Sequence, residues 1–320
     1  MFFMGALLTA VPLSSAEPPE PPFLDLGTLP ADTMSGASAV NEAGQVVGWS
    51  QGSYPDPIHA FLWENGTMTD LGTLGGSTAQ AYDINDKGQV VGVSSTSSGL
   101  NHAFLWEDGT MTDLGTLGGP DSYAYGLNNR GDVVGWTTGA SGRPRAFLWS
   151  NGSMSDIGTL GGDAAEAWDI NDAGQIVGDS EAFGLSHAFL WQDGTMTDLG
   201  TLGGIRGFSG AYGINEAGQV VGYSYTQTYG MEHAFLWEDG TMTDLGAREG
   251  YTSRAFAISD VGQIVGTSNE HAILWENGTM RDLGNTNAFD VNDEGQIVGW
   301  GLARSVSLPP SSGRRRSLPR

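Results

Sequence analysis

The sequence predicts an all-β fold, a β-propeller of four-stranded blades, and three observations lead to it. The segment HAFLWEDGTMTDLGTLGG at residues 102–119 recurs, and its copies begin at residues 59, 102, 145, 187, 233 and 271. A second block, AYDINDKGQVVG at residues 81–92, recurs between those copies. Glycine is abundant, with 50 residues, and no helical periodicity accompanies it. Units of about 43 residues that hold four strands are typical of propeller blades.

The first block reads as strand, tight turn, strand. HAFLW is a short run of large apolar residues, and TMTDL is a second β-rich run. An Asn-Gly or Asp-Gly pair links the two in every copy, as at Asp108-Gly109, and such pairs tolerate the positive φ of a two-residue hairpin. We expect these to be the third and fourth strands, with the tryptophan of HAFLW (Trp106 here) in the core between blades.

The second block supplies the first and second strands. Two β-rich runs flank the sequence Asn-Asp-Lys-Gly-Gln at residues 85–89, and related sequences recur in the other copies. A four-residue turn with glycine in the left-handed position has this composition. Each unit therefore contains four strands.

The two ends of the repeat region complement each other. Residues 24–29, LDLGTL, match a last strand, and residues 288–300, AFDVNDEGQIVGW, match a first and a second strand. We expect them to share one composite blade, because closure removes exposed sheet edges. The prediction is a seven-bladed ring, with a spiral solenoid as the alternative, and with complete units at residues 31–76, 77–119, 120–162, 163–204, 205–250 and 251–287.

The segments outside residues 24–300 differ in composition. Residues 1–16 hold a short apolar run that ends in Ser-Ser-Ala, which is typical of a signal peptide and too short to span a bilayer. Residues 17–23 form a Pro-rich leader, and residues 301–320 read as a basic disordered tail. We expect a secreted, extracellular protein without a membrane span, with the cell surface or periplasm as alternatives.

Charge and cysteine content argue against several partners. The formal net charge is −24, and the chain has no cysteine. So acidic a body repels nucleic acid, which we do not expect as a partner. The absence of thiols removes support for a disulfide framework and for redox chemistry, and we expect no cofactor.

The histidines and the turns do not predict a metal site. Each histidine begins a third strand, so one per blade leaves neighbours on the order of 10 Å apart, whereas ligands lie about 2 Å from a zinc ion. The turn at residues 83–88 has Lys87 where a calcium loop needs an oxygen ligand. We expect no metal, and we expect each histidine to form a structural hydrogen bond with an adjacent strand or blade.

The repeats resemble the bacterial HAF-type extracellular repeat family, which is named for the His-Ala-Phe start. The resemblance covers about residues 24–300 through HAFLWEDGTMTDLGTLGG and AYDINDKGQVVG. Departures are Arg145 for the histidine, Ile273 for the phenylalanine, and residues 247–250 in place of Thr-Leu-Gly-Gly. The resemblance implies secretion and no particular activity.

Residues that bind a ligand should interrupt the repeat, because repeated residues serve every blade alike. The loops between second and third strands share one face with the links between blades. Only the connections on this face vary in length. Aromatic side chains gather there and suit a sugar ring or a protein surface. The predicted ligand-binding face contains Trp49, Tyr54, Tyr123, Trp136, Phe208, Tyr223, Tyr229 and Trp300.

These observations predict a monomeric, non-catalytic binding or scaffold module for a carbohydrate or another surface protein. We identify no catalytic residue. The alternative is a propeller glycosidase or lyase with its site in the axial pocket. A glycosidase would need two carboxyl groups about 5 to 9 Å apart.

Overall fold

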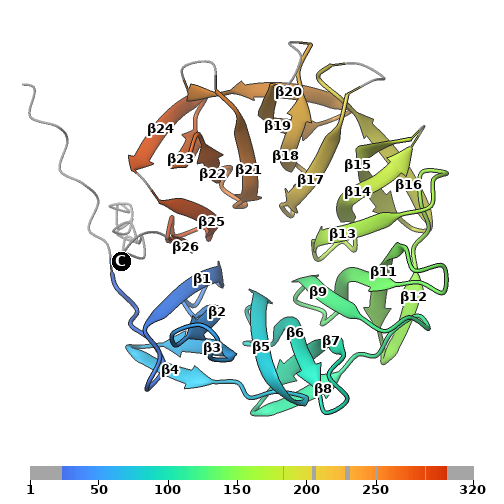
Figure 1. Ribbon diagram of the computed structural model, residues 1–320. Coiled ribbons are helices and arrows are strands. Elements are labelled where there is room, and N and C mark those ends of the chain that lie inside the picture. Colours follow the sequence, from blue (N-terminus) through green and yellow to red (C-terminus); the bar gives the residue numbers. More distant parts are fainter. Residues whose placement is uncertain are drawn as a thin grey trace, which may run out of the picture.

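The computed structural model describes residues 24–182, 184–203, 207–227, 231–248, 251–284 and 286–300. Their strands form sheets arranged as blades around a central axis, which makes the fold an all-β β-propeller (Figure 1). The expected signal peptide, leader and basic tail lie outside the described residues. In the parts of the chain given above, no helix is long and apolar enough to cross a bilayer.

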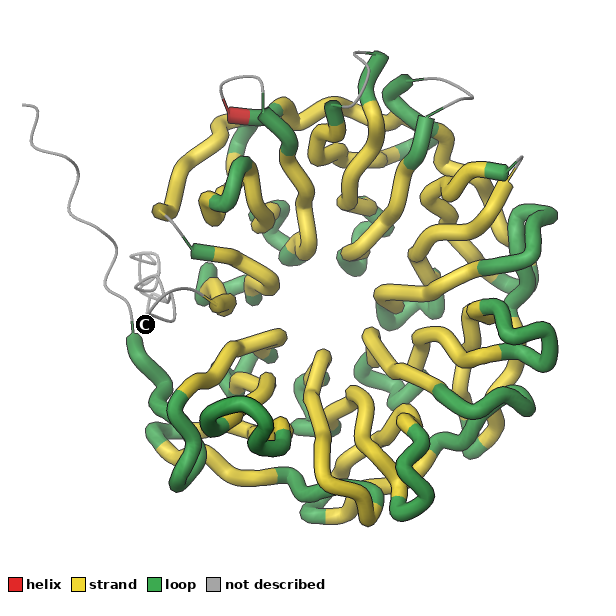
Figure 2. Tube along the Cα trace, viewed as in Figure 1, coloured by secondary structure: helices red, strands yellow, loops and turns green. Residues whose placement is uncertain are grey.

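Six sheets contain four strands each, in sequence order, and the first strand of each lies nearest the axis (Figures 1 and 2). The first three are β1–β4 (Met34–Val40, Val46–Gln51, Ile58–Glu64, Thr67–Asp70), β5–β8 (Gly75–Ile84, Val90–Thr96, Asn101–Glu107, Thr110–Asp113) and β9–β12 (Ser122–Leu127, Val133–Thr138, Pro144–Ser150, Ser153–Asp156). The next three are β13–β16 (Ala165–Ile170, Ile176–Ala182, Leu185–Gln192, Thr195–Gly200), β17–β20 (Ser209–Ile214, Val220–Tyr225, Glu232–Glu238, Thr241–Gly246) and β21–β24 (Ser253–Ile258, Ile264–Ser268, His271–Glu276, Thr279–Gly284). A two-stranded sheet, β25–β26 (Asn287–Val291, Ile297–Trp300), follows.

The predicted hairpins between third and fourth strands are confirmed. In the second blade Asp108 and Gly109 have φ of 49° and 81°, and Asn65 and Gly66 of the first blade have 50° and 83°. Positive φ at both central residues is the geometry of a type I′ turn, which matches the twist of the flanking strands.

A β-bulge in the first strands explains the repeated Val-Val-Gly of the second strands. In the second blade the pairing of β5 with β6 shifts between Ala81 and Asp83. Gly92 lies opposite this bulge, and an added Cβ there would collide with the carbonyl oxygen of Gln80. Glycine at this position is therefore needed by the blade itself.

The asparagine of each turn between first and second strands also joins neighbouring blades. Asn85 Oδ1 accepts hydrogen bonds from the backbone N–H groups of Lys87 and Gln89, at 3.1 and 3.0 Å. Its Nδ2 donates to the carbonyl oxygen of Asn128 in the next blade, at 3.0 Å. Equivalent bonds to the next blade come from Asn41, Asn128, Asn171, Asn215 and Asn292.

The last of these bonds closes the ring. The β25–β26 sheet lies between the β21–β24 blade and the β1–β4 blade (Figure 1). Asn292 Nδ2 donates to the carbonyl oxygen of Asn41 at 2.9 Å, and the backbone N–H of Asp293 donates to Glu42 Oε1 at 3.0 Å. Residues 251 positions apart in sequence are thus bonded as neighbouring blades are elsewhere.

The predicted seven blades and N-terminal closing strand are wrong. The structure has six four-stranded blades and the two-stranded sheet, and residues 24–29 form no strand. These residues align with residues 112–117, but β8 already ends at Asp113, so most of the motif is linker. Leu26 and Leu29 nevertheless pack into the hydrophobic cluster shared by the first blade and the β25–β26 sheet.

The core lies between blades and depends on phenylalanine more than on tryptophan. Phe104 is fully buried beside Val90 and Ala81, whereas Trp106 is partly buried at the edge of the same cluster. The prediction that the HAFLW tryptophans are core residues holds only for Trp275, with 5% of its surface exposed. The third strand lies toward the outer edge of the disc, where only the short fourth strand covers the indole.

Candidate functional site

The two faces of the ring carry different chemistry. Each blade alternates strand direction, so both tight turns lie on one face, which we call the turn face. The connections between second and third strands, together with the links between blades, lie on the opposite side, the loop face. The innermost strands run from the loop face to the turn face, and their side chains line the axis.

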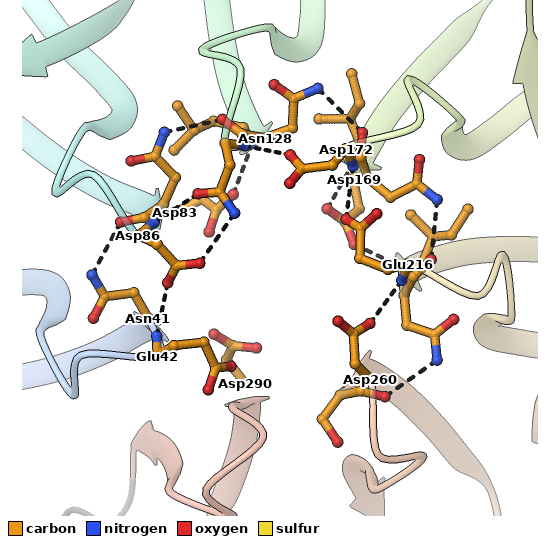
Figure 3. A pocket seen from close by; sticks show the side chains of 18 of the residues that line it. Asn41, Glu42, Asp83, Asp86, Asn128, Asp169, Asp172, Glu216, Asp260 and Asp290 are labelled. Carbon is orange, nitrogen blue, oxygen red and sulfur yellow. Dashed lines mark hydrogen bonds between the residues drawn. The ribbon is translucent and has the colours of Figure 1, made fainter.

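A cavity of about 330 Å³ lies on the axis at the turn face (Figure 3). One residue of each turn forms what we call the acidic ring. Its members are all carboxylates except one asparagine, and they are Glu42, Asp86, Asn129, Asp172, Glu216, Asp260 and Asp293. Such a ring would attract cations if its oxygens were free.

The oxygens of the acidic ring are used to join blades. The backbone N–H of Glu42 donates to Asp86 Oδ1 at 3.0 Å, and that of Asp86 donates to Asn129 Oδ1 at 2.9 Å. Asn129, Asp172, Glu216 and Asp293 repeat this bond to the next blade. The ring is therefore explained by structure, and the described residues contain no group of three or more potential ligands placed to hold a metal ion.

Three aspartates beneath this ring also connect blades. Asp83 Oδ2 accepts the backbone N–H of Leu127 at 2.8 Å, and Asp169 Oδ2 accepts that of Ile214 at 2.9 Å. Asp290 bonds Val40 in the same way. Burial raises the pKa of Asp83 to about 8 and that of Asp169 to about 6, and it also raises the pKa of Asp290.

We expect this burial to make stability depend on pH. Between about pH 4 and about pH 8 the folded protein keeps a proton on Asp83 that the unfolded chain has released, so stability falls as pH rises through this window. Asp83→Asn removes the titration, and its melting temperature should fall less over the same range. Thermal melts of both proteins measure this, with the exposed Glu270→Gln as a control that follows the wild type. Equal slopes for wild type and Asp83→Asn would contradict the assignment.

The histidines lie toward the outer edge of the disc and have structural partners, which confirms their predicted role. His102 Nδ1 lies 2.8 Å from Asp113 Oδ2, and His187 Nδ1 lies 2.8 Å from Asp198 Oδ2, in each case on the neighbouring fourth strand. Where the repeat has Arg145, its Nε donates to the equivalent carboxylate at 2.8 Å.

A belt of aromatic side chains surrounds the axis on the loop-face side of the buried aspartates. Neighbouring rings contact one another across blade boundaries, with centroids 4.5 to 5.8 Å apart. The first blade has the small Ser38 at this position and interrupts the belt. The aromatic belt consists of Tyr82, Tyr125, Trp168, Tyr212, Phe256 and Phe289.

A second tier of aromatic residues, which we call the rim, lies closer to the loop face. Trp136 stacks on Tyr123 with centroids 4.6 Å apart. Trp49 lies against Gly36, where an added Cβ would approach the indole Nε1 to 2.7 Å, and Tyr223 lies against Gly210 in the same way. Belt and rim, which together we call the loop-face mouth, give this end of the axis an aromatic surface.

Charged residues interrupt this mouth at two places. Glu166 and Asp179 are paired across β13 and β14, so their side chains lie on the same face of the sheet. Trp168 Nε1 donates to Asp179 Oδ1 at 2.7 Å. Two blades further on, Arg254 of β21 binds Glu232 through two hydrogen bonds of 2.7 and 3.0 Å.

The predicted binding-face residues fall into two groups. Trp49, Tyr123, Trp136 and Tyr223 belong to the rim, in the first, third and fifth blades. Trp300, 42% exposed, ends β26 and pairs with Asn287 of the innermost strand.

The other three predicted residues do not belong to the aromatic belt or its rim. Tyr54 is 92% exposed on the loop between β2 and β3, and no aromatic contact involves it among the described residues. Phe208 packs on Tyr225 with centroids 5.4 Å apart. Tyr229 lies outside the described residues.

The belt and the Glu166–Asp179 pair were not predicted from the sequence. The signal for the belt was present, because an aromatic residue occupies the same column of the repeat in most copies, as in Tyr82-Asp-Ile-Asn and Trp168-Asp-Ile-Asn. That regularity favoured a packing role. The signal for the pair was weaker, because the sequence does not show that Glu166 and Asp179 lie opposite each other. That follows only from the register of β13 and β14.

Comparisons with known proteins bear on the fold alone. No family model matches the chain, and no curated protein matches it in sequence. Puromycin hydrolase is similar in structure, with a TM-score of 0.56 and 13% identity over 84% of this chain and 50% of that chain. TolB from Acinetobacter baumannii gives 0.51 and 12%, over 75% and 61%. The β-propeller domain of the Trilobed protease from Pyrococcus furiosus gives 0.51 and 8%, over 79% and 84%.

Proposed function

We propose that the protein is a non-catalytic binding module that holds a carbohydrate at its loop-face mouth. The observation that carries the proposal is the aromatic belt, whose rings lie in contact around the axis and are topped by the rim. Sugar rings stack on aromatic faces, and charged groups such as Glu166 and Arg254 suit their hydroxyls.

The position of the belt favours a carbohydrate over a protein surface. Its residues belong to the innermost strands, which lie inside the ring of blades (Figure 1), and their rings contact one another across blade boundaries. A narrow chain or a single sugar can approach such rings, whereas a broad protein surface meets the exposed loops first. Tyr54, the most exposed of the predicted residues that the structure describes, is the marker for that second mode.

We extend the proposal to location and family. The apolar run at residues 1–16 supports secretion, and the repeated HAFLW and AYDIND blocks support membership of the HAF-type repeat family. We also propose that the protein acts as a monomer, because each four-stranded blade packs against neighbouring sheets of the same chain.

Paired substitutions test the site. We expect Trp136→Ala to weaken binding about ten-fold or more, the loss typical of an aromatic residue at the centre of a binding site. Tyr54→Ala should leave affinity unchanged. Calorimetric titration with a panel of trisaccharides, neutral and charged, measures both. If Tyr54→Ala weakens binding and Trp136→Ala does not, the exposed loops hold the ligand and the proposed site is wrong.

A glycosidase or lyase is the second candidate, and one observation favours it. Glu166 and Asp179 are cross-strand partners, a relation that places Cβ atoms about 4.5 to 5.5 Å apart and suits a pair of catalytic carboxyl groups. Burial and the charge of Asp179 raise the pKa of Glu166 to about 7, as a general acid requires. Release of nitrophenol from aryl glycosides by the wild type but not by Glu166→Gln would favour this candidate.

A further inference from the structure

The loop-face mouth carries uncompensated negative charge at one blade. At the position of Glu166 the other innermost strands have Gly36, Gln80, Tyr123, Gly210, Arg254 and Asn287. At the position of Asp179 the other second strands carry uncharged residues. The β13–β16 blade is thus the one place in the described mouth where carboxylates occupy both members of the pair.

Neutral donors hold Asp179, and Glu166 has no bonding partner. Asp179 accepts hydrogen bonds of 2.7 Å from Trp168 Nε1 and from Ser186 Oγ. Within the described part of the chain, no hydrogen bond or ion pair involves the Glu166 carboxylate. The nearby cation, Arg254, is engaged by both oxygens of Glu232. Two adjacent carboxylates therefore face the mouth without a counter-charge.

A small cavity adjoins the pair. It has a volume of about 200 Å³ and lies at the loop face of the β13–β16 blade. Glu166, Asp179 and Glu181 supply its charge, and Leu185, Phe208 and two alanines supply its apolar wall. Burial and the charge of Asp179 raise the pKa of Glu166, which is the response of a carboxylate that lacks a cation. The space suits a small polar group attached to a larger ring.

The mouth already holds one cation on an aromatic face. The Arg254 guanidinium carbon lies 4.7 Å from the centre of the Tyr223 ring. Trp168 contacts Tyr125 at 4.5 Å and Tyr212 at 5.8 Å, so several ring faces and edges surround the side of the mouth where Glu166 and Asp179 lie. Aromatic faces and carboxylates together favour organic cations.

We propose that the carbohydrate held at this mouth is an amino sugar with a free, protonated amino group. Its ring stacks on the belt beside Trp168, and its ammonium group donates hydrogen bonds to Glu166 and Asp179. An ammonium group has several N–H donors, so it can bond both carboxylates at once. The inference rests on the proposed carbohydrate-binding function and names the class of sugar.

The first test uses the unmodified protein. Calorimetric titrations compare the β-1,4 trimer of glucosamine with the trimer of N-acetylglucosamine, which differs in having no charge on nitrogen. We expect the free amine to bind roughly ten-fold more tightly, as charge-assisted hydrogen bonds to a partly buried carboxylate imply. The difference should shrink in high salt. Equal affinity, or tighter binding of the acetylated trimer, would overturn the inference and leave the carbohydrate site in place.

The second test locates the amine. Glu166→Gln should reduce the affinity for the glucosamine trimer roughly ten-fold and leave that for the acetylated trimer unchanged. Glu270→Gln removes one exposed charge elsewhere and should leave both unchanged. Unchanged glucosamine binding by a folded Glu166→Gln variant would overturn the inference, and if the variant does not fold, the comparison in the wild type decides. The inference would also be overturned if neutral trisaccharides bind and neither amino-sugar trimer does. If no saccharide binds at all, the proposed function itself is wrong.

Discussion

Deletion of residues 24–30 should lower the free energy of unfolding by about 2 to 5 kcal/mol, the value for exposing one buried and one partly buried leucine. Leu29 is 5% exposed in the cluster that joins the first blade to the β25–β26 sheet, and Leu26 packs against it. The deletion also removes the hydrogen bond of 3.1 Å from the Leu29 backbone to Ser50 Oγ. Urea unfolding followed by tryptophan fluorescence measures the loss.

A truncation at the other end is the control for this deletion. Removal of residues 301–320 takes away none of the contacts described above, so we expect its unfolding midpoint to match that of the full chain. If both truncations behave alike, the N-terminal segment does not help to close the ring. The two ends would then be held by the Asn292–Asn41 and Asp293–Glu42 bonds alone.

Phe104→Ala should cost about 3 to 5 kcal/mol, as other fully buried aromatic residues do. Phe104 has no exposed surface and packs between the first and second blades, so the cavity that alanine leaves cannot fill with water or collapse freely. Trp106→Ala should cost less, because the indole is only partly buried. Denaturant melts of the two variants rank these costs. A larger loss for Trp106→Ala would contradict the assignment of the core to phenylalanine.

Local features were predictable from the sequence because each is determined within a few residues. Asp108-Gly109 predicts its own hairpin, and the sequence from Asn85 to Gln89 predicts its own turn. Two alternating strand pairs per repeat then predict the blade. The sequence did not predict that Asp86 Oδ1 would accept a hydrogen bond from the backbone of a neighbouring blade.

The misses arise where the repeat meets the geometry of the ring. Residues 24–29 resemble the end of a fourth strand. Three fourth strands end at the aspartate and three end two residues later, so much of the similarity covered a linker. Phe104 and Trp106 are two residues apart in one strand and share a face of the sheet, so the strand pattern cannot rank them by burial. The belt and the Glu166–Asp179 pair depend on which side chains face the axis, and a bulge in each first strand alters that alternation.

The tryptophans permit the most direct test of the loop-face mouth as the binding site. The chain has 10 of them. Those of the axial region are Trp49, Trp136, Trp168 and Trp300, and those of the third strands are Trp63, Trp106, Trp149, Trp191, Trp237 and Trp275. Indole N–H signals in a ¹⁵N-labelled sample, assigned by single Trp→Phe substitutions, report on both groups in one titration with the glucosamine trimer. Binding at the mouth predicts that signals of the axial group shift, with Trp168 among them, while the third-strand signals stay in place. Shifts confined to the third-strand group would place the ligand on the outer surface of the ring and contradict the account.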